Sequence, residues 1–405
     1  MTVASLHLIA NIYRVMDRSQ VSIVLFQGSS VVAEEQEVLE RIDALKQTLR
    51  HRLHEPRRWF GSIRRLSVAR AIQGSNTIEG YDATLDDAAA VAVGEAPLDA
   101  DEETRRALEG YRSAMTYVLQ LAEEPDFEYS TRLVKSLHFM MTSYDLKSRP
   151  GLWRSGTAFV FNEESGEVVY EGADVDLVPG LMAALVERLN ESDDLPPLVR
   201  AAMAHLNLVL IHPFRDGNGR MAQCLQSLVL AREKTPLSPF LLSIEEYLGR
   251  NTQAYYNVLA QVGNGTWQPE RDTRPWIRFT LTAHLRQAQT MVRRIQEAER
   301  MWSELESLVD ELSLSERTVI ALFDAAQRLR VRNATYRVSF AESGEELSEQ
   351  TATRDLRQLV EAGLLIPNGA SRGRFYVASS RLAKIRQAIV RDRDPRDDSD
   401  LFGAT

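Results

Sequence analysis

The chain has 405 residues, and at ~150 residues per domain this length excludes a single small module and favours two or three domains. Hydrophobic residues make up 44% and charged residues 26%, a composition that excludes a disordered chain and can bury several cores. Because the net charge is −9, any contact with nucleic acid has to come from a local basic patch.

The single cysteine, Cys224, excludes an internal disulfide framework and any zinc site built from several cysteines. We therefore expect a cytoplasmic protein, and we interpret Cys224 as a residue that packs a helix. The apolar patches Leu6–Ile12 and Val21–Phe26 fall short of the ~18 residues of a membrane span, so no membrane partner is expected. The first thirty residues are expected to be weakly structured, and no function is assigned to residues 1–34.

The next part of the chain is predicted to be helical. Apolar residues at helical spacing predict an amphipathic helix from Glu35 to Leu53 and a second helical stretch from Gly61 to Gln73. The acidic segment Pro97–Glu103 predicts a break. A run of helices follows it and extends, with one interruption, to about Arg294.

The interruption is a predicted β-hairpin between Thr157 and Gly172. Its strands are Ala158–Phe161 and Val168–Tyr170, joined by a polar turn. An isolated two-stranded ribbon is marginally stable unless it packs on something. The hairpin is therefore either a structural flap on the helical body or an open edge that accepts another strand.

The pattern changes again after a long connecting helix, predicted over Met291–Val309. Helices are predicted over Ser315–Leu329 and Ser348–Ala362, and a hairpin over Leu364–Val377 follows them. This order of helix, helix and hairpin is typical of a winged helix-turn-helix.

The predicted C-terminal domain differs in charge from the rest of the chain. Between Ser313 and Lys384, eleven Lys and Arg residues stand against eight Asp and Glu residues. Arg354 and Arg357 lie one turn apart on the predicted recognition helix, and Arg372 and Arg374 lie in the predicted wing, so DNA contact is one interpretation. The alternative is a docking or dimerisation domain with a solvated charged face.

One loop carries most of the chemistry. The segment Pro197–Ile211 is apolar almost all round, as in a helix at the centre of a bundle, and it leads into the sequence HPFRDGNGR, residues 212–220. Glycines on both sides of Asn218 favour an anion-binding nest at a helix N-terminus. A neutral His212 can take a proton from a hydroxyl, Asp216 can hold Mg²⁺, and Arg220 can bind phosphate oxygens.

Residues 212–220 are similar, position for position, to the first nine positions of the Fic-family signature, H-P-F-x-D/E-G-N-G-R-x-x-R. Gly151–Arg154 resembles the family's motif before the flap, and the segments Tyr255–Leu259 and Trp276–Phe279 resemble its closing helices. The resemblance implies a mainly α fold: a Fic-type helical bundle with a β-hairpin flap, here followed by a small winged-helix domain. The domains expected are 1–97 (N-terminal helical region), 98–292 (Fic domain), 293–312 (connecting helix), 313–385 (winged helix-turn-helix) and 386–405 (charged tail).

The resemblance also implies roles for individual residues. Such proteins transfer AMP from ATP to a target hydroxyl, with His212 as the general base and Asp216 as the Mg²⁺ ligand. The flap residues Phe159, Val160 and Phe161 would align a target protein as an added strand. The residues expected to contact the nucleotide are Gly217, Asn218, Gly219, Arg220, Gln223, Tyr255 and Asn264.

An inhibitory motif is expected before the Fic domain. The sequence SNTIEG, residues 75–80, matches the family pattern [S/T]-x-x-x-E-[G/N] with Ser75, Glu79 and Gly80. A carboxylate placed in a phosphate-binding nest repels the γ-phosphate and competes for its arginine. The final arginine of the signature is Gln223 here, which supplies no charge to the γ-phosphate or to Glu79.

The function predicted from the sequence is a protein AMP-transferase that uses ATP and Mg²⁺ and that modifies a partner protein or itself. Two alternatives remain open. One is a DNA-binding regulator whose Fic domain has weak or lapsed transferase activity. The other is a hydrolase that removes AMP with the help of Glu79. Duplex DNA and a second copy of the chain are the further partners considered.

Overall fold

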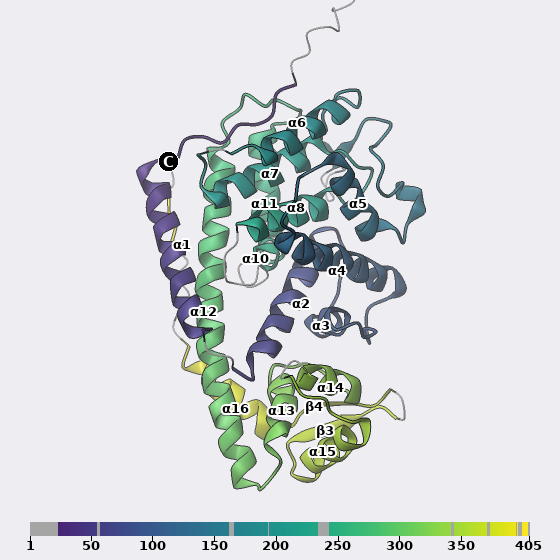
Figure 1. Cartoon of the computed structure of the whole chain (residues 1–405), viewed down its shortest axis with the longest axis vertical. Coiled ribbons are helices and arrows are strands. Elements are labelled where there is room, and N and C mark those ends of the chain that lie inside the picture. The colour runs from purple at the N-terminus through teal and green to yellow at the C-terminus, as the bar shows by residue number, and fades with distance from the viewer. Residues whose placement is uncertain are drawn as a thin grey trace, which may run out of the picture.

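The computed structural model describes residues 23–54, 57–161, 166–192, 194–233, 243–341, 344–370, 373–393, 395 and 399–403. The described chain is mainly helical, as expected, and carries two small β-hairpins. Figure 1 shows a bundle of helices joined to a smaller C-terminal module by one long helix, α12. None of the helices in the described ranges is both long and apolar enough to cross a membrane.

The elements before the first hairpin are mostly those expected. The first two predicted helices are confirmed, although α2 runs five residues further than predicted, and α3 was not predicted. The bounds are α1 Ala33–Arg52, α2 Phe60–Ile78, α3 Leu85–Ala92, α4 Glu102–Glu123, α5 Thr131–Thr142 and a 3₁₀ turn at Leu146–Ser148.

The hairpin and the helices around the HPFRDGNGR loop follow. The predicted hairpin is confirmed as the antiparallel pair β1–β2, although residues 162–165 of its turn lie outside the described residues. The bounds are β1 Phe159–Phe161, β2 Val168–Glu171, α6 Val178–Asn190, α7 Pro197–Ile211, α8 Asn218–Arg232, α10 Glu245–Arg250, α11 Thr252–Gly263 and α12 Arg274–Glu311.

Helix α7 lies at the centre of the bundle. Leu208 and Ile211 face one hydrophobic cluster, whereas Leu206 and Leu210 face another. A helix with apolar residues on every side is stable only when other elements cover it all round. The last residue of α7 is therefore held at a fixed point in the interior.

Helix α12 is a single helix of 38 residues, about 57 Å long. It begins at Arg274, with Pro275 in its first turn, and so runs without a break through the position predicted to separate the Fic domain from the connecting helix. Trp276 anchors its start, because the indole N–H donates to the carbonyl of Ala202 at 2.7 Å. In Figure 1, α1 lies alongside the same helix.

The C-terminal module, residues 313–391, contains both predicted helices and the predicted hairpin. Its elements are a 3₁₀ turn at Glu316–Thr318, α13 Val319–Ala326, α14 Asn333–Ala341, α15 Glu349–Glu361, β3 Leu365–Asn368, β4 Phe375–Ala378 and α16 Ser380–Arg391. Helix α14 was not predicted, and Val331 forms an isolated antiparallel bridge to Tyr376 of β4. The winged-helix interpretation of this module stays a prediction.

The expectation of weak structure up to residue 30 is wrong for the described residues 23–30. The backbone N–H of Phe26 donates to Asn207 Oδ1 at 2.9 Å, and Asn207 Nδ2 donates back to the carbonyl of Phe26 at 3.1 Å. The Phe26 ring is buried edge-on against Trp267. The sequence did not reveal this contact because its two halves lie 181 residues apart.

Helices α2 and α10 cross so closely that only glycine fits at the contact. A Cβ added to Gly74 would lie 2.8 Å from the Cα of Glu246, closer than real Cβ atoms come to a backbone. A Cβ added to Gly249 would likewise lie 2.7 Å from the Cα of Gly74. The backbones of the two helices are therefore in direct contact.

We predict that Gly74→Ala lowers the free energy of unfolding by about 1–3 kcal/mol, although alanine is the better helix former, because the added methyl overpacks the crossing. Chemical denaturation measures the change. Gly156→Ala is the matched control, since nothing lies within 4 Å of its added Cβ. Equal unfolding free energies for the two variants would contradict the close crossing.

Candidate active site

The loop between α7 and α8 is shaped by two residues with left-handed backbone. His212, directly after α7, has φ +54°, and Gly217, directly before α8, has φ +73°. For a residue with a side chain this conformation costs roughly 1–2 kcal/mol, so the contacts around His212 must hold it. The two turns bring the end of α7 and the start of α8 together.

Arg154 supplies the strongest of these contacts. Its Nε–H donates to the carbonyl of His212 at 2.7 Å, and its backbone N–H donates to Pro213 at 2.9 Å. The same guanidinium donates to Gly156 O at 2.6 Å and to Ala173 O, at the two ends of the β1–β2 hairpin. Arg154 therefore fixes the backbone of His212 relative to the hairpin.

Asn218 closes the loop from the other side. Its Oδ1 accepts from the N–H of Phe214 at 2.9 Å, and its Nδ2 donates to the Phe214 carbonyl at 3.0 Å. The predicted nucleotide contact at Asn218 is thereby limited to its backbone N–H. The ring of Phe214 is buried and stacks on His138, with centroids 3.6 Å apart.

His138, on α5, is a site residue that the sequence analysis missed. Its Nδ1 accepts from the N–H of Gly151 at 2.9 Å, so Nε2 carries the proton and donates to the carbonyl of Asp216 at 3.0 Å. Burial lowers the pKa of His138 to about 4, which keeps the ring neutral. The only sequence signal was a histidine among apolar residues of an amphipathic helix.

His212 has the protonation state that a general base requires. Burial lowers its pKa to about 4. Its Nδ1 lies 3.2 Å from the carbonyl of Val209, which can only accept, so the proton resides on Nδ1. The lone pair of Nε2 is then available to accept a proton.

Glu79 occupies the N-terminus of α8. It caps α2, and its Oε1 accepts from the N–H of Arg220 at 3.1 Å. A Cβ at Gly219 would collide with this oxygen, so the glycine makes room for the carboxylate. Burial raises the pKa of Glu79, whereas the charge of Arg220 opposes that rise. The motif of Ser75, Glu79 and Gly80 thus ends at the predicted nest, with Ser75 buried in α2 and Gly80 turning the chain at φ +82°.

Arg220 is fully buried and held by two tyrosines that the sequence analysis did not identify. Its Nη1 donates to Tyr144 Oη at 3.1 Å, and Tyr144 in turn donates to Tyr81 Oη at 3.0 Å. The guanidinium carbon lies 5.0 Å from the centroid of the Tyr81 ring. Burial lowers the pKa of Arg220, but Glu79, Tyr144 and Asp216 together outweigh burial and hold the pKa above its ordinary value.

Gln223 lies one turn after Arg220 and is buried. Within the described residues neither atom of its side-chain amide has a hydrogen-bond partner, and none of the hydrogen bonds there joins it to Glu79. The adjacent Cys224 is also buried, and burial raises the pKa of its thiol, in agreement with a packing role.

Of the residues expected to contact the nucleotide, Tyr255 lies on α11 and Asn264 lies at the end of that helix. Tyr255 is buried in the core, where its hydroxyl bonds to His205 Nε2 at 2.9 Å. Asn264 is exposed and ends α11 with φ +44°, next to Gly265, which bonds to β2. The neighbouring Tyr256 reaches the site instead, since its hydroxyl donates to the carbonyl of Ile78 at 2.7 Å, just before Glu79.

The hairpin presents one free edge. Strand β2 bonds to β1 on one side and to Gly265 on the other, so β1 is the outer strand. On β1, Phe159 and Phe161 are 46% and 56% exposed, with Val160 between them half-buried. This edge can accept an added strand with apolar side chains.

Asp216 is the loop's candidate metal ligand. Its side chain is 43% exposed, and its Oδ2 lies 3.5 Å from Arg220 Nη2. No group of three or more His, Cys, Asp or Glu side chains that could hold a metal ion occurs in the described ranges. A lone, partly exposed carboxylate suits Mg²⁺, which binds through one or two carboxylates and substrate phosphates.

The arginines predicted to contact DNA belong to a separate surface. Arg354 and Arg357 are exposed on α15, and Arg374 is exposed just before β4. Arg372 lies outside the described residues. In Figure 1 this module sits at the other end of α12 from α7 and α8.

Comparisons with known proteins find similarity over a part of the chain that includes the loop between α7 and α8. Residues 128–230 match the model of the Fic/DOC family. A protein named Protein adenylyltransferase Fic from Nematostella vectensis is 28% identical over 282 residues, which cover 62% of this chain and 57% of that protein. Protein adenylyltransferase fic-1 from Caenorhabditis elegans is 39% identical over 97 residues, or 24% of this chain and 16% of that protein. The chain thus spans 57% of the length of the first of these relatives and 16% of the length of the second.

Solved structures confirm the predicted Fic-type helical fold. A Fic family protein from Desulfovibrio desulfuricans G20 superposes with a TM-score of 0.54 over 87% of this chain and 98% of that chain, at 21% identity. Residues 134–508 of Fic-1 from C. elegans superpose with a TM-score of 0.51 over 65% of this chain and 73% of that chain, also at 21% identity.

We predict that Arg154→Lys lowers the free energy of unfolding by about 1.5–3 kcal/mol, because one ammonium cannot reach the carbonyls that the guanidinium holds. Denaturant unfolding measures the change. Arg149→Lys is the control, since Arg149 makes one exposed bond, to Ser155. If both variants unfold alike, Arg154 is not what holds the left-handed turn.

Proposed function

We propose that this chain, a protein of the Fic/DOC family, transfers AMP from ATP to a hydroxyl side chain of a protein. The observation that carries the proposal is the joint placement of His212 and the N-terminus of α8. A neutral imidazole with a free Nε2 lies on one side of a short loop, and backbone N–H groups with a buried arginine lie on the other.

The proposed chemistry uses both sides of the loop. The Nε2 atom of His212 takes the proton of the target hydroxyl, whose oxygen forms a bond to the α-phosphorus of ATP. The bond from the α-phosphorus to the bridging oxygen breaks, and pyrophosphate leaves. The N–H groups of Gly217, Asn218 and Gly219 and the guanidinium of Arg220 stabilise the phosphate charge.

Asp216 would hold Mg²⁺, which supplies further neutralisation of the phosphates when bound. His138 supports this role, since it fixes the backbone of Asp216 through the carbonyl. The open edge of β1 would bind the target segment as an added strand, with Phe159 and Phe161 in contact with its side chains.

Glu79 is proposed to inhibit this reaction. Its carboxylate already accepts from Arg220 N–H, a donor that the phosphates of ATP require. A second negative charge at the same donor is repelled. Because the buried amide of Gln223 adds no positive charge, the charge that attracts Glu79 comes from Arg220.

We predict that His212→Ala lowers the rate of AMP transfer by about 10²–10⁴-fold, the usual contribution of general acid–base catalysis. Intact-mass analysis after incubation with Mg²⁺ and ATP detects each added AMP. Calorimetry should give an ATP affinity close to that of the parent protein, because the base acts on the hydroxyl. His51→Ala, at an exposed position on α1, is the control. Transfer at the parental rate in His212→Ala would rule out this base.

The C-terminal module favours a second, separate activity: binding of duplex DNA. Arg354 and Arg357 project from the face of α15 opposite its buried residues Ala352, Leu356 and Leu359. Within the part of the chain that the structure describes, no ion pair or hydrogen bond involves the side chains of these arginines or of Arg374. Exposed cations without acidic partners are available to phosphates.

We predict that the full chain binds duplex DNA with an affinity that falls as salt rises. Arg354→Ala combined with Arg357→Ala should reduce the slope of log K against log salt by about 0.9 for each phosphate that the arginines neutralise in the parent protein. Fluorescence anisotropy measures the slope. The control is Arg105→Ala with Arg106→Ala, two arginines of α4 already paired with Glu102. Absence of binding at low salt would leave the module as a docking domain.

A further inference from the structure

The helix that carries Glu79 also reaches the C-terminal module. Arg65 lies in the second turn of α2 and Glu79 directly follows its last turn, so the two residues are about 21 Å apart along one unbroken helix. A helix of this kind moves as a unit. Whatever holds Arg65 therefore also sets the position of Glu79.

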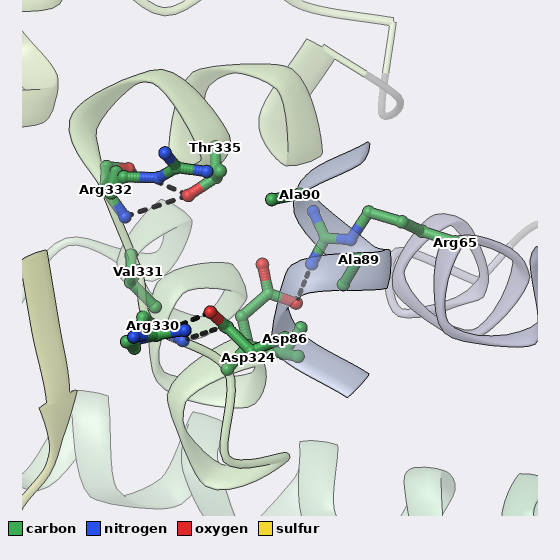
Figure 2. Close-up of a pocket in the computed structure, with 10 residues that line it drawn as sticks. Arg65, Asp86, Ala89, Ala90, Asp324, Arg330, Val331, Arg332 and Thr335 are labelled. Carbon is green, nitrogen blue, oxygen red and sulfur yellow. Dashed lines mark hydrogen bonds and ion pairs between the residues drawn. The ribbon is translucent and has the colours of Figure 1, made fainter. Parts of the chain in front are cut away.

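Arg65 is held by a buried ion pair. Its Nη2 lies 2.5 Å from Oδ1 of Asp324, on α13, and the two side chains are only 4% and 3% exposed. Ser339, on α14, completes the group, because it is bonded to the Arg65 guanidinium and donates to Asp324 Oδ2 at 3.0 Å. Figure 2 shows Arg65 reaching from α2 past Ala89 and Ala90 toward Asp324.

Arg330 makes a second connection beside the first. Its Nε donates to Asp86 Oδ2 at 2.6 Å, its backbone N–H donates to the other oxygen of Asp86 at 2.6 Å, and its Nη2 lies 2.9 Å from Asp99. Asp86 belongs to α3, which packs on α2. The first connection thus ends on α2 itself, and the second ends on α3, which packs against α2.

The contact between these groups is polar and not fully packed. A cavity of about 20 Å³ lies among Arg65, Asp86, Asp324 and Arg330, as Figure 2 shows. A polar cavity of this size has room for a water molecule. Water that enters this cavity can replace the hydrogen bonds of the ion pair when the pair opens.

We propose that the C-terminal module acts as a latch on the inhibitory helix, with the ion pair of Arg65 and Asp324 as its closing contact. While the ion pair is closed, α2 is held so that Glu79 sits at the N-terminus of α8. Opening the pair frees α2 to withdraw Glu79 and exposes the N–H groups that ATP requires. This inference rests on the proposed function and adds to it a regulatory role for the module.

The test uses the full chain and compares initial rates of AMP transfer. Asp324→Asn keeps the size of the side chain but removes its charge, which leaves Arg65 buried without an ionic partner. We expect the rate to rise about fivefold or more, the lower end of common coupling strengths. Glu79→Gly should also raise the rate, and Asp324→Asn should add nothing in that background, because both changes remove the same carboxylate from the nest.

Asp355→Asn is the matched control. Asp355 is also fully buried and pairs with an arginine, Arg317, at 2.7 Å, but this pair lies inside the module and does not reach α2. The control should destabilise the module without raising the rate. Arg330→Gln is a milder second variant in case Asp324→Asn unfolds the module. A rate that rises in Glu79→Gly but in neither latch variant would overturn the proposal.

ATP affinity separates the latch from the transfer reaction. If neither the parent protein nor Glu79→Gly transfers AMP, the proposed function is wrong, and calorimetry with Mg²⁺ and ATP then tests the latch alone. An affinity that increases in Asp324→Asn as it does in Glu79→Gly, and not in Asp355→Asn, supports the latch. An affinity that increases only in Glu79→Gly overturns it.

Discussion

The position of His212 and of the loop to α8 depends on where α7 stops. Because α7 is covered by apolar clusters on both sides, its last turn cannot shift without opening the core. His212 then leaves the helix in a left-handed conformation that Arg154 holds through its carbonyl. Because the short loop to α8 begins at this fixed point, the His212 imidazole and the N-terminus of α8 keep the same position relative to each other.

Charge in the interior of the site is balanced across segments that are distant in sequence. Arg220 belongs to α8 and is buried, Glu79 directly follows α2, and Asp216 lies on the loop before α8. Tyr81 and Tyr144 complete the surroundings of the guanidinium without adding charge. The charge of Arg220 is therefore balanced by nearby carboxylates, although its Nε and Nη2 have no hydrogen-bond partner in the part of the chain that the structure describes.

The parts of the structure that could be predicted are those encoded by neighbouring residues. Nine consecutive residues indicated the loop, two short apolar runs joined by a polar turn indicated the β1–β2 hairpin, and a segment apolar almost all round indicated α7. The parts that were missed depend on contacts between distant segments: His138 on the carbonyl of Asp216, 78 residues away, and Tyr144 on Arg220, 76 residues away. Tyr255 was expected to contact the nucleotide from a motif that says nothing about burial, and in the structure it packs in the core against Trp276.

The pairing of Phe26 with Asn207 ties the segment before α1 to the core. Asn207 is buried near the middle of α7, and the extended segment before α1 satisfies both its donor and its acceptor. Without that segment, the buried Oδ1 of Asn207 would lose its partner and Nδ2 would keep only the carbonyl of Met203, at a cost of roughly 1–3 kcal/mol for the unsatisfied oxygen. The extended segment before α1 therefore covers part of the core. A chain shortened to begin at α1 would lose that part of the interior.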